Sequence, residues 1–213
     1  MTIIELARLF LPPPTTSATP QLLANLPAVT QIIEASSGLP TRFFSSLTDP
    51  HTMFVIGGWP SVEAHRDGFQ GSEEQKRLWP LIDGLMDIQW MEYVDVGNGR
   101  VPEAAREGRK GWVLGVASWR VGVLNLEQRT RLQERKKEHT HEGAGIHEVV
   151  WAWNIKKGQE HGEEDVLVEL GGFEERSAAE KWAGNIQGVK SDSSEKTPEV
   201  FLMERTKLAT EES

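Results

Sequence analysis

The spacing of apolar and polar residues predicts the same succession of elements twice along the chain. Apolar residues alternate with polar ones in the predicted strands and recur at helical spacing in the predicted helices. In the first half these patterns give strand, helix, strand, strand, helix and strand over residues 2–11, 19–38, 42–47, 52–59, 61–86 and 88–96. The second half gives the same order over residues 112–121, 125–138, 149–156, 166–173, 177–189 and 200–208.

Local signals mark the ends of the predicted helices. Pro20 suits the first position of a helix and Gly38 suits its end, so the first helix is expected between them. Pro27 lies inside this segment and is expected to kink or split the helix. Ser72 and Gln75 have the spacing of a capping box at the start of a later helix.

Short segments of the two halves also resemble each other directly. Met53–Trp59 is similar to Leu167–Phe173, which lies 114 residues later, and both contain Gly-Gly before an aromatic residue. Trp90–Tyr93 is similar to Leu202–Arg205 at an offset of 112 residues. Similar segments in the same order at nearly constant spacing indicate a tandem duplication.

The order β-α-β-β-α-β predicts a ferredoxin-like unit in each half and therefore an α+β fold. Such a unit carries its helices on one face of an antiparallel sheet, so the other face needs a cover. Two repeats packed sheet to sheet would form an intramolecular dimeric α/β barrel. The expected organisation is a first repeat over residues 1–97, a linker over 98–110, a divergent second repeat over 111–209 and a tail over 210–213.

Composition narrows the possible functions. The chain has 213 residues, a net charge of −9 and no cysteine. The acidity argues against nucleic-acid binding, and the lack of cysteine excludes disulfides, thiolate nucleophiles and cysteine-held metals. No apolar run is long enough for a membrane span, and the first eleven residues lack the features of a signal peptide. We therefore expect a cytoplasmic protein with no membrane or nucleic-acid partner.

The segment Gly57-Gly58-Trp59-Pro-Ser-Val-Glu-Ala-His65, together with the closing strand Trp90–Tyr93, resembles the antibiotic-biosynthesis-monooxygenase domain of the dimeric α/β-barrel superfamily. The resemblance covers residues 1–97 and 108–209 and is stronger in the first. The tandem arrangement resembles fungal proteins of this kind. The resemblance implies the barrel fold and one of several activities: quinone-forming or haem-degrading monooxygenase, polyketide cyclase, dehydratase, isomerase, or a non-catalytic stress-response barrel.

Candidate catalytic residues lie in the first half. His65 lies one turn into the predicted helix that follows Trp59 and is the best general base in the chain, although it could equally be a surface residue. Ala179 stands at the equivalent place in the second half, so the chemistry would be confined to one pocket. Tyr93 could hydrogen-bond a developing oxyanion, and His51 follows a turn in which an exposed histidine is common. The substrate-binding candidates are Trp59, Trp90, Phe69 and Phe43, with a place in the core as the alternative for Trp59.

Cofactor motifs are absent from the sequence. There is no glycine-rich nucleotide fingerprint, no P-loop and no serine nucleophile elbow. His139, His141 and His147 form the densest group of possible metal ligands, but their spacing favours a polar loop and no metal is expected. We therefore expect no cofactor, with haem as the alternative that the resemblance leaves open.

These observations favour a cofactor-independent small-molecule enzyme of secondary metabolism. It would act on a hydrophobic aromatic or polyketide-like substrate through proton abstraction by His65, in an oxygenation, cyclisation, dehydration or isomerisation. The alternative is a non-catalytic ligand-binding or stress-response barrel. Because the fusion would satisfy sheet packing within one chain, the expected state is a monomeric pseudo-dimer or a weak homodimer.

Overall fold

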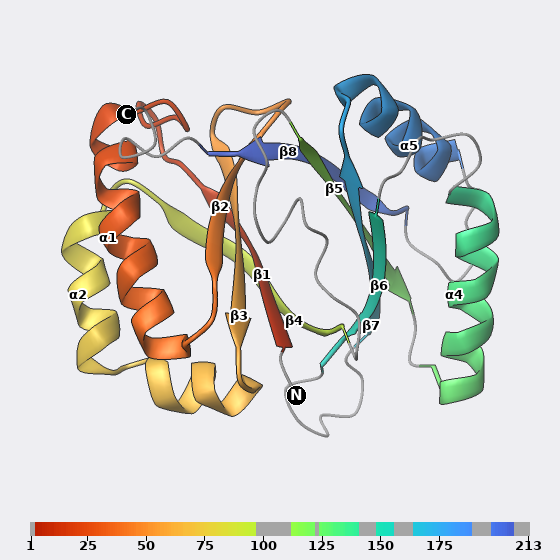
Figure 1. The fold of residues 1–213 in the computed structure, drawn as a ribbon, viewed down its shortest axis with the longest axis horizontal. Coiled ribbons are helices and arrows are strands. Elements are labelled where there is room, and N and C mark those ends of the chain that lie inside the picture. Colours follow the sequence, from red (N-terminus) through yellow and green to blue (C-terminus); the bar gives the residue numbers. More distant parts are fainter. Residues whose placement is uncertain are drawn as a thin grey trace. The chain divides into compact units, whose positions relative to one another are not determined.

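A computed structural model provides the structure of the protein. It describes residues 3–96, 112–121, 124–140, 148–155, 164–188 and 197–206, without the side chains of residues 137–140 and 188. The fold is α+β, and the described residues contain eight strands. By hydrogen bonding these strands follow one another in the closed antiparallel order of a barrel, in which β1 (Ile3–Phe10) is followed by β3 (Thr52–Trp59), β2 (Thr41–Ser46), β8 (Glu199–Arg205), β5 (Val113–Val121), β7 (Asp165–Phe173), β6 (Glu148–Asn154) and β4 (Asp87–Asp95) (Figure 1).

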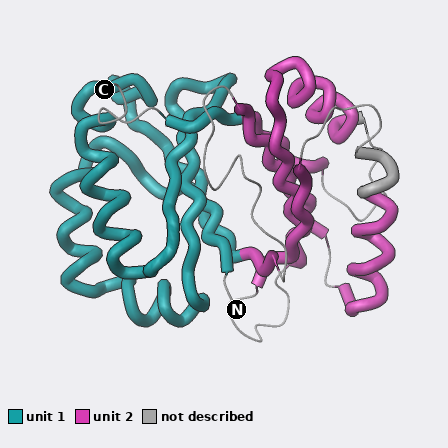
Figure 2. Tube along the Cα trace, viewed as in Figure 1, with its two compact units in different colours: residues 1–93, 203–213 teal, residues 94–202 magenta. Residues whose placement is uncertain are grey.

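The chain divides into two compact units, drawn in teal and magenta in Figure 2. Unit 1 contains Met1–Tyr93 and Met203–Ser213, and unit 2 contains Val94–Leu202. Strands β4 and β8 each cross this boundary, so the units differ from the uninterrupted halves expected from the sequence. The reason is visible in the pairing of β2 with the end of β8, where Phe44 lies opposite Arg205. The expected linker over residues 98–110 lies outside the described residues.

Unit 1 has its helices on one face of its strands (Figure 1). The elements between its strands are α1 (Pro20–Ser37), the π-helix η1 (Ala64–Phe69) and α2 (Glu73–Ile82). Helix α1 ends at Gly38, whose φ of 70° is the left-handed conformation that glycine adopts at little cost. The expected split at Pro27 does not occur: α1 runs through it, with Leu26 and Val29 buried on either side. Packing against the sheet therefore outweighs the local preference of proline.

The strand register of unit 1 decides which side chains meet on the helix-covered face. Gly57 of β3 lies between Glu5 of β1 on one side and Thr41 of β2 on the other. Residues directly opposite one another in an antiparallel sheet share a face, so Glu5 and Thr41 flank a position that carries no side chain. Trp59 follows two residues later and shares that face.

Unit 2 is built on the elements β5, α4 (Leu126–Thr140), β6, β7 and α5 (Arg176–Gly188). Asn125 and Gln128 form a reciprocal capping box at the start of α4, with side-chain oxygens accepting from each other's backbone N–H at 2.9 Å. None of the helices in the described parts of the chain is long and apolar enough to cross a membrane.

Candidate active site in unit 1

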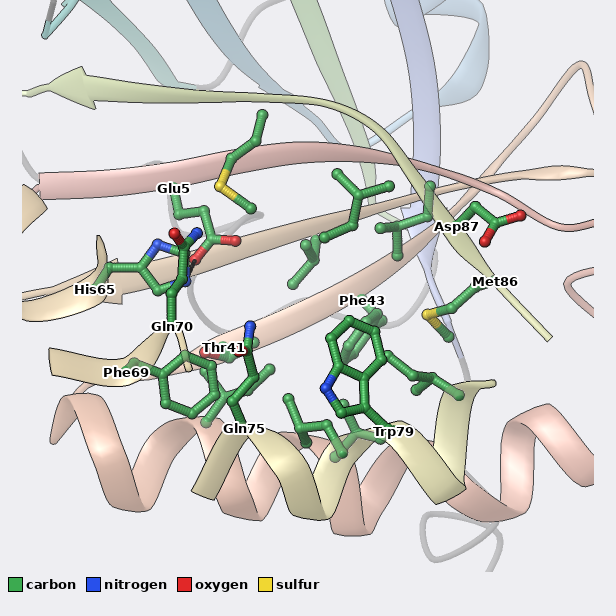
Figure 3. A pocket seen from close by; sticks show the side chains of 18 of the residues that line it. Glu5, Thr41, Phe43, His65, Phe69, Gln70, Gln75, Trp79, Met86 and Asp87 are labelled. Carbon is green, nitrogen blue, oxygen red and sulfur yellow. Dashed lines mark ion pairs between the residues drawn. The ribbon is translucent and has the colours of Figure 1, made fainter. Parts of the chain in front are cut away.

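A cavity of about 310 Å³ lies in unit 1 between the sheet and the helices α1, η1 and α2 (Figure 3). This volume is near the lower end of the range for small-molecule sites, about 300 to 1,000 Å³. Its walls are mostly apolar. The lining residues are Glu5, Leu9, Val29, Ile33, Thr41, Phe43, Val55, Trp59, His65, Phe69, Gln70, Gln75, Leu78, Trp79, Ile82, Met86, Asp87, Ile88 and Met91.

Polar side chains gather at one end of this cavity, where Figure 3 shows Glu5, His65 and Gln70 close together. The indole N–H of Trp59 donates to Glu5 Oε2 at 2.6 Å. His65 Nε2 lies 3.6 Å from the same oxygen. Glu5 and His65 are both buried. A carboxylate in this setting is rare unless it is paired or has a chemical task.

The π-helix η1 places two of the aromatic rings. Its wider turn is closed by a bond from the Gln70 N–H to the His65 carbonyl at 2.9 Å. His65 and Phe69 consequently project from the same side of the turn, with ring centroids 5.7 Å apart. The Trp59 ring lies 4.4 Å from the His65 ring. Such single π turns occur often at functional sites, and here the turn directs an imidazole at the carboxyl group of Glu5.

The hydroxyl of Tyr93 holds the other side of the imidazole. It lies 2.6 Å from His65 Nδ1, in a buried contact. Burial raises the pKa of Tyr93 to about 12, and the nearby charge of Glu5 adds to this shift. Tyr93 therefore keeps its proton at neutral pH, and its hydroxyl is hydrogen-bonded to Nδ1. This bond fixes the orientation of the imidazole relative to Glu5.

The carboxyl group of Glu5 titrates close to neutrality. Burial raises its pKa from 4.5 to about 7, and the hydrogen bond from Trp59 opposes part of that shift. A group with this pKa can take up and release a proton at physiological pH. Of the polar groups at this end of the cavity, Glu5 is therefore suited to general acid–base chemistry.

The opposite end of the cavity is partly open. Trp79 and Ile88 line it and are 51% and 57% exposed, respectively. Figure 3 shows Trp79, Met86 and Asp87 there, away from the Glu5 and His65 pair. The cavity thus has mostly apolar walls and a polar inner end, which suits a hydrophobic molecule that carries a polar group at one end.

The structure brings together most of the residues singled out in the sequence. Trp59, His65, Phe69 and Phe43 line the cavity, and Tyr93 reaches it through its contact with His65. Their assigned roles in catalysis and substrate binding stay predictions.

Two candidates lie elsewhere. The Nδ1 atom of His51 lies 2.8 Å from the Thr15 carbonyl and 3.1 Å from that of Leu11, so this residue ties together a loop. Trp90 is not among the residues that line the cavity.

Sequence reasoning missed Glu5, Gln70 and Gln75. Glu5 had a usable signal, because it is the one acidic residue in the apolar run from Ile3 to Leu6. Its position in the strand places it on the same face as Ala7 and Leu9, which are buried. Gln75 had been assigned to a capping box. Ser72 does accept from its N–H at 3.1 Å, while the Gln75 side chain accepts from Gly71 at 2.6 Å.

Comparison with solved structures shows which proteins share this fold. The chain is similar to an anthrone oxidase-like protein, with 15% identity and a TM-score of 0.56, over 96% of this chain and 91% of that one. It is also similar to a protein from Lactobacillus acidophilus described as a monooxygenase, with 10% identity and a TM-score of 0.52, over 98% and 95% of the two chains. A protein described as a chlorite dismutase matches with 9% identity and a TM-score of 0.63, over 97% and 95%.

These similarities establish the fold as the dimeric α/β barrel of monooxygenase-like and chlorite dismutase-like proteins. At such low identity they establish nothing beyond the fold. No family model matches the sequence, and no curated protein matches it either.

The expectation that the protein binds no cofactor is wrong, because it conflicts with the proteins that share this fold. The similar structures include chlorite dismutases and a dye-decolorizing peroxidase from Bacteroides thetaiotaomicron, which are haem-binding proteins. Absence of a nucleotide motif therefore does not exclude a cofactor, because a haem is held by shape and one axial ligand rather than by a sequence fingerprint.

The cavity of unit 1 does not fit a haem through its histidine. Iron would need a free imidazole nitrogen, yet Nδ1 of His65 is bonded to Tyr93 and Nε2 faces Glu5. Within the described residues there is no group of three or more side chains arranged to hold a metal ion. The group His139, His141 and His147 lies outside the described side chains.

Proposed function

We propose that this protein is a monooxygenase-like enzyme that removes a proton from a phenolic or enolic aromatic substrate in the cavity of unit 1. The observation that carries the proposal is the buried carboxyl group of Glu5, with a pKa of about 7, at the inner end of an apolar cavity. The fold shared with an anthrone oxidase-like protein and with monooxygenases supports this reaction class.

Glu5 acts as the proton acceptor. Its ionised form is stabilised by the Trp59 N–H at 2.6 Å and by the facing imidazole of His65. Both contacts are on one side of the carboxylate and hold it in a fixed orientation. The mostly apolar walls favour a hydrophobic substrate beside Glu5, and the proton that Glu5 removes comes from this substrate. This assignment replaces His65 by Glu5 as the base.

His65 and Tyr93 position the carboxylate. The hydroxyl of Tyr93 is hydrogen-bonded to Nδ1 of His65, and Nε2 of the same ring faces Glu5. His65 then strengthens its interaction with Glu5 when the carboxylate forms. Tyr93 acts through His65 and not as a direct donor to a substrate oxyanion.

The overall reaction is written for anthrone as an example. Its enol loses the O–H proton to Glu5, and the electron-rich anion is oxidised by O₂. Anthrone and O₂ give anthraquinone and water: two hydrogens leave the ring carbon, one oxygen atom enters as the new carbonyl, and the other leaves as water. Dioxygen is the oxidant and its second atom is the product water.

Oxygen uptake with anthrone tests the proposal. We expect the wild-type protein to accelerate oxidation above the protein-free rate, with activity rising with pH around pH 7 as Glu5 ionises. Glu5→Gln should lower kcat by about 10²- to 10⁴-fold, the usual range for a general base. Glu180→Gln, an exposed carboxylate of unit 2, is the matched control and should leave the rate unchanged.

Two results would decide against this function. Full activity of Glu5→Gln would remove Glu5 from the mechanism. Tight binding of anthrone without any acceleration of its oxidation would favour the alternative, a non-catalytic ligand-binding barrel.

We also propose that the two units descend from a tandem duplication. Support comes from the order of elements: strand, helix, strand, strand, helix, strand occurs from β1 to β4 and again from β5 to β8. Divergence would then have kept a cavity in unit 1 and filled the corresponding space in unit 2.

A further inference from the structure

A second polar feature lies beside Glu5, at the floor of the cavity. Thr41 is 1% exposed and lines the cavity. Its hydroxyl oxygen is buried and makes no hydrogen bond within the part of the chain that the structure describes. A buried hydroxyl without a partner costs free energy, so such groups are rare in native proteins.

The backbone around Thr41 is, by contrast, fully engaged. Its N–H donates to the Glu34 carboxylate at 2.8 Å, and its carbonyl accepts from Arg42 at 2.7 Å. These bonds hold the residue in place and fix the direction of its side chain. The hydroxyl is thus held toward the cavity without a protein partner.

Gly57 leaves an empty position between Thr41 and Glu5. It pairs with both in the sheet, and a methyl group there would lie 3.3 Å from Thr41 Oγ1, 3.5 Å from Trp59 Nε1 and 3.6 Å from Glu5 Oε2. Three polar atoms therefore converge on the space over Gly57, which a side chain at this position would enter. We call this space the Gly57 niche.

We propose that the Gly57 niche binds the hydroxyl oxygen of the aromatic substrate, with Thr41 donating to that oxygen and Glu5 accepting its proton. The inference rests on the proposed function for the fate of that proton, but the binding itself needs no turnover. When the proton moves to Glu5, the hydroxyl of Thr41 faces the resulting oxyanion. The niche accordingly selects hydroxylated aromatic molecules over their ethers and hydrocarbons.

The geometry supports an oxygen atom and argues against a larger group. One donor, Thr41, and one acceptor, Glu5, match the two hydrogen-bonding roles of a phenolic O–H. A methyl ether lacks the proton that Glu5 accepts and adds a carbon atom beside the three side chains that surround the niche. Sites that hydrogen-bond a substrate hydroxyl discriminate strongly against analogues that lack it.

Calorimetric titration at pH 8 with 1-naphthol and 1-methoxynaphthalene tests the niche. We expect wild-type protein to bind 1-naphthol about tenfold more tightly, since leaving a buried hydrogen-bonding partner unsatisfied costs about this much. Thr41→Val should reduce the preference to about threefold or less, and Thr41→Ser should restore it. Gly57→Ala, which fills the niche, should also abolish the preference. Thr130→Val, on the exposed face of α4, is the matched control.

Thermal unfolding gives a second readout. Because the Thr41 hydroxyl has no described partner, Thr41→Val should keep or raise the melting temperature while it loses ligand preference. A residue needed only for stability would show the opposite result.

The outcomes separate the niche from the proposed function. A preference for 1-naphthol that is unchanged in Thr41→Val, or no binding of 1-naphthol at all, would overturn the niche. A preference that depends on Thr41, in a protein that never consumes O₂ with anthrone, would support the niche and overturn the proposed oxidation. If Thr41→Val oxidises anthrone as fast as wild type, the proposed oxidation is supported and the niche is overturned.

Discussion

The two units carry equivalent sheet positions but use them in opposite ways. In unit 1, Ile3 pairs with Trp59, and in unit 2, Val113 pairs with Phe173. Counting from these pairs, the position of Glu5 in unit 1 is that of Gly115 in unit 2. Unit 1 therefore places a carboxyl group where unit 2 has no side chain.

The space above Gly115 is filled by an indole. Trp182 of α5 is fully buried, and its ring lies so near Gly115 that an added methyl group would be 2.4 Å from it. Two further cavity positions of unit 1, Leu9 and Phe43, correspond to Trp119 and Trp151 in unit 2. The rings of these two tryptophans stack with centroids 5.5 Å apart.

The comparison shows that equivalent sheet positions can line either a cavity or a packed core. In unit 2, three indole rings occupy the region between sheet and helices, and the buried carboxylate of Glu169 serves Trp182 as a hydrogen-bond acceptor at 3.0 Å. In unit 1, smaller side chains at the same positions leave a cavity that Glu5 and His65 face. The high tryptophan content of the chain thus mainly reflects packing in unit 2.

The largest stability effect should follow from emptying the filled unit. Trp182→Ala removes a fully buried indole and leaves a cavity, so we expect a loss of about 3–5 kcal/mol in the free energy of unfolding. Urea unfolding followed by circular dichroism measures it. Trp79→Ala, at a position that is 51% exposed, is the control and should cost much less. Similar losses for both variants would contradict the contrast between the units.

The buried carboxylate of unit 1 should make stability depend on pH. The pKa of Glu5 is about 7 in the folded protein and 4.5 in its ordinary state, so the folded protein retains this proton longer as pH rises. The contribution of Glu5 to the free energy of unfolding is therefore fully present below pH 4.5 and is lost as pH rises to about 7. Each pKa unit corresponds to about 1.4 kcal/mol, which gives about 3 kcal/mol in total.

Glu5→Gln isolates this effect, because glutamine has no charge to bury and can still accept from Trp59. The stability of wild type minus that of Glu5→Gln should fall by about 3 kcal/mol between pH 4.5 and pH 7 and then level off. A difference that is constant with pH would show that Glu5 titrates normally.

Gly115→Ala should cause a smaller loss in the free energy of unfolding. The added methyl group would meet the Trp182 ring at 2.4 Å, and this ring is fully buried. We expect a loss of about 1–3 kcal/mol, typical of overpacking. If the variant is as stable as wild type, the ring does not fill the position that Glu5 occupies in unit 1.

The smallest expected change is a gain in stability. Gly184 lies in α5 near Trp182, and a methyl group there would meet no atom within 4 Å. Gly184→Ala should therefore stabilise the helix by about 0.5–1 kcal/mol. This variant is a matched control for Gly115→Ala, and chemical denaturation of both proteins gives the comparison directly.

Sequence pattern predicted the elements well where the apolar periodicity was strong. The strand over residues 52–59 has the predicted bounds, and the first helix ends at Gly38 as expected. Local signals suffice here because glycine and proline restrict the backbone directly. The π-helix that carries His65 was not predicted, since the bond from Gln70 to His65 arises from packing against Trp59 and Phe69.

The site was predicted only in part. His65, Trp59 and Phe69 could be located because they follow the Gly-Gly pair closely in sequence. Glu5 was missed because it lies 60 residues from His65 and joins it only through strand pairing. The Gly57 niche is a space rather than a residue, and a sequence pattern does not reveal where three strands leave room.

The pairing of β2 with the end of β8 affects how the protein folds. Ser45 and Thr206 are hydrogen-bonded at 2.9 Å although 161 residues separate them along the chain. Contacts between such distant residues form slowly, because a long loop must close before they contribute. During synthesis, the open edge of β2 stays uncovered until residues 203–206 have left the ribosome. An uncovered strand edge can pair with other chains. We therefore expect aggregation to start from the incomplete chain rather than from the finished protein.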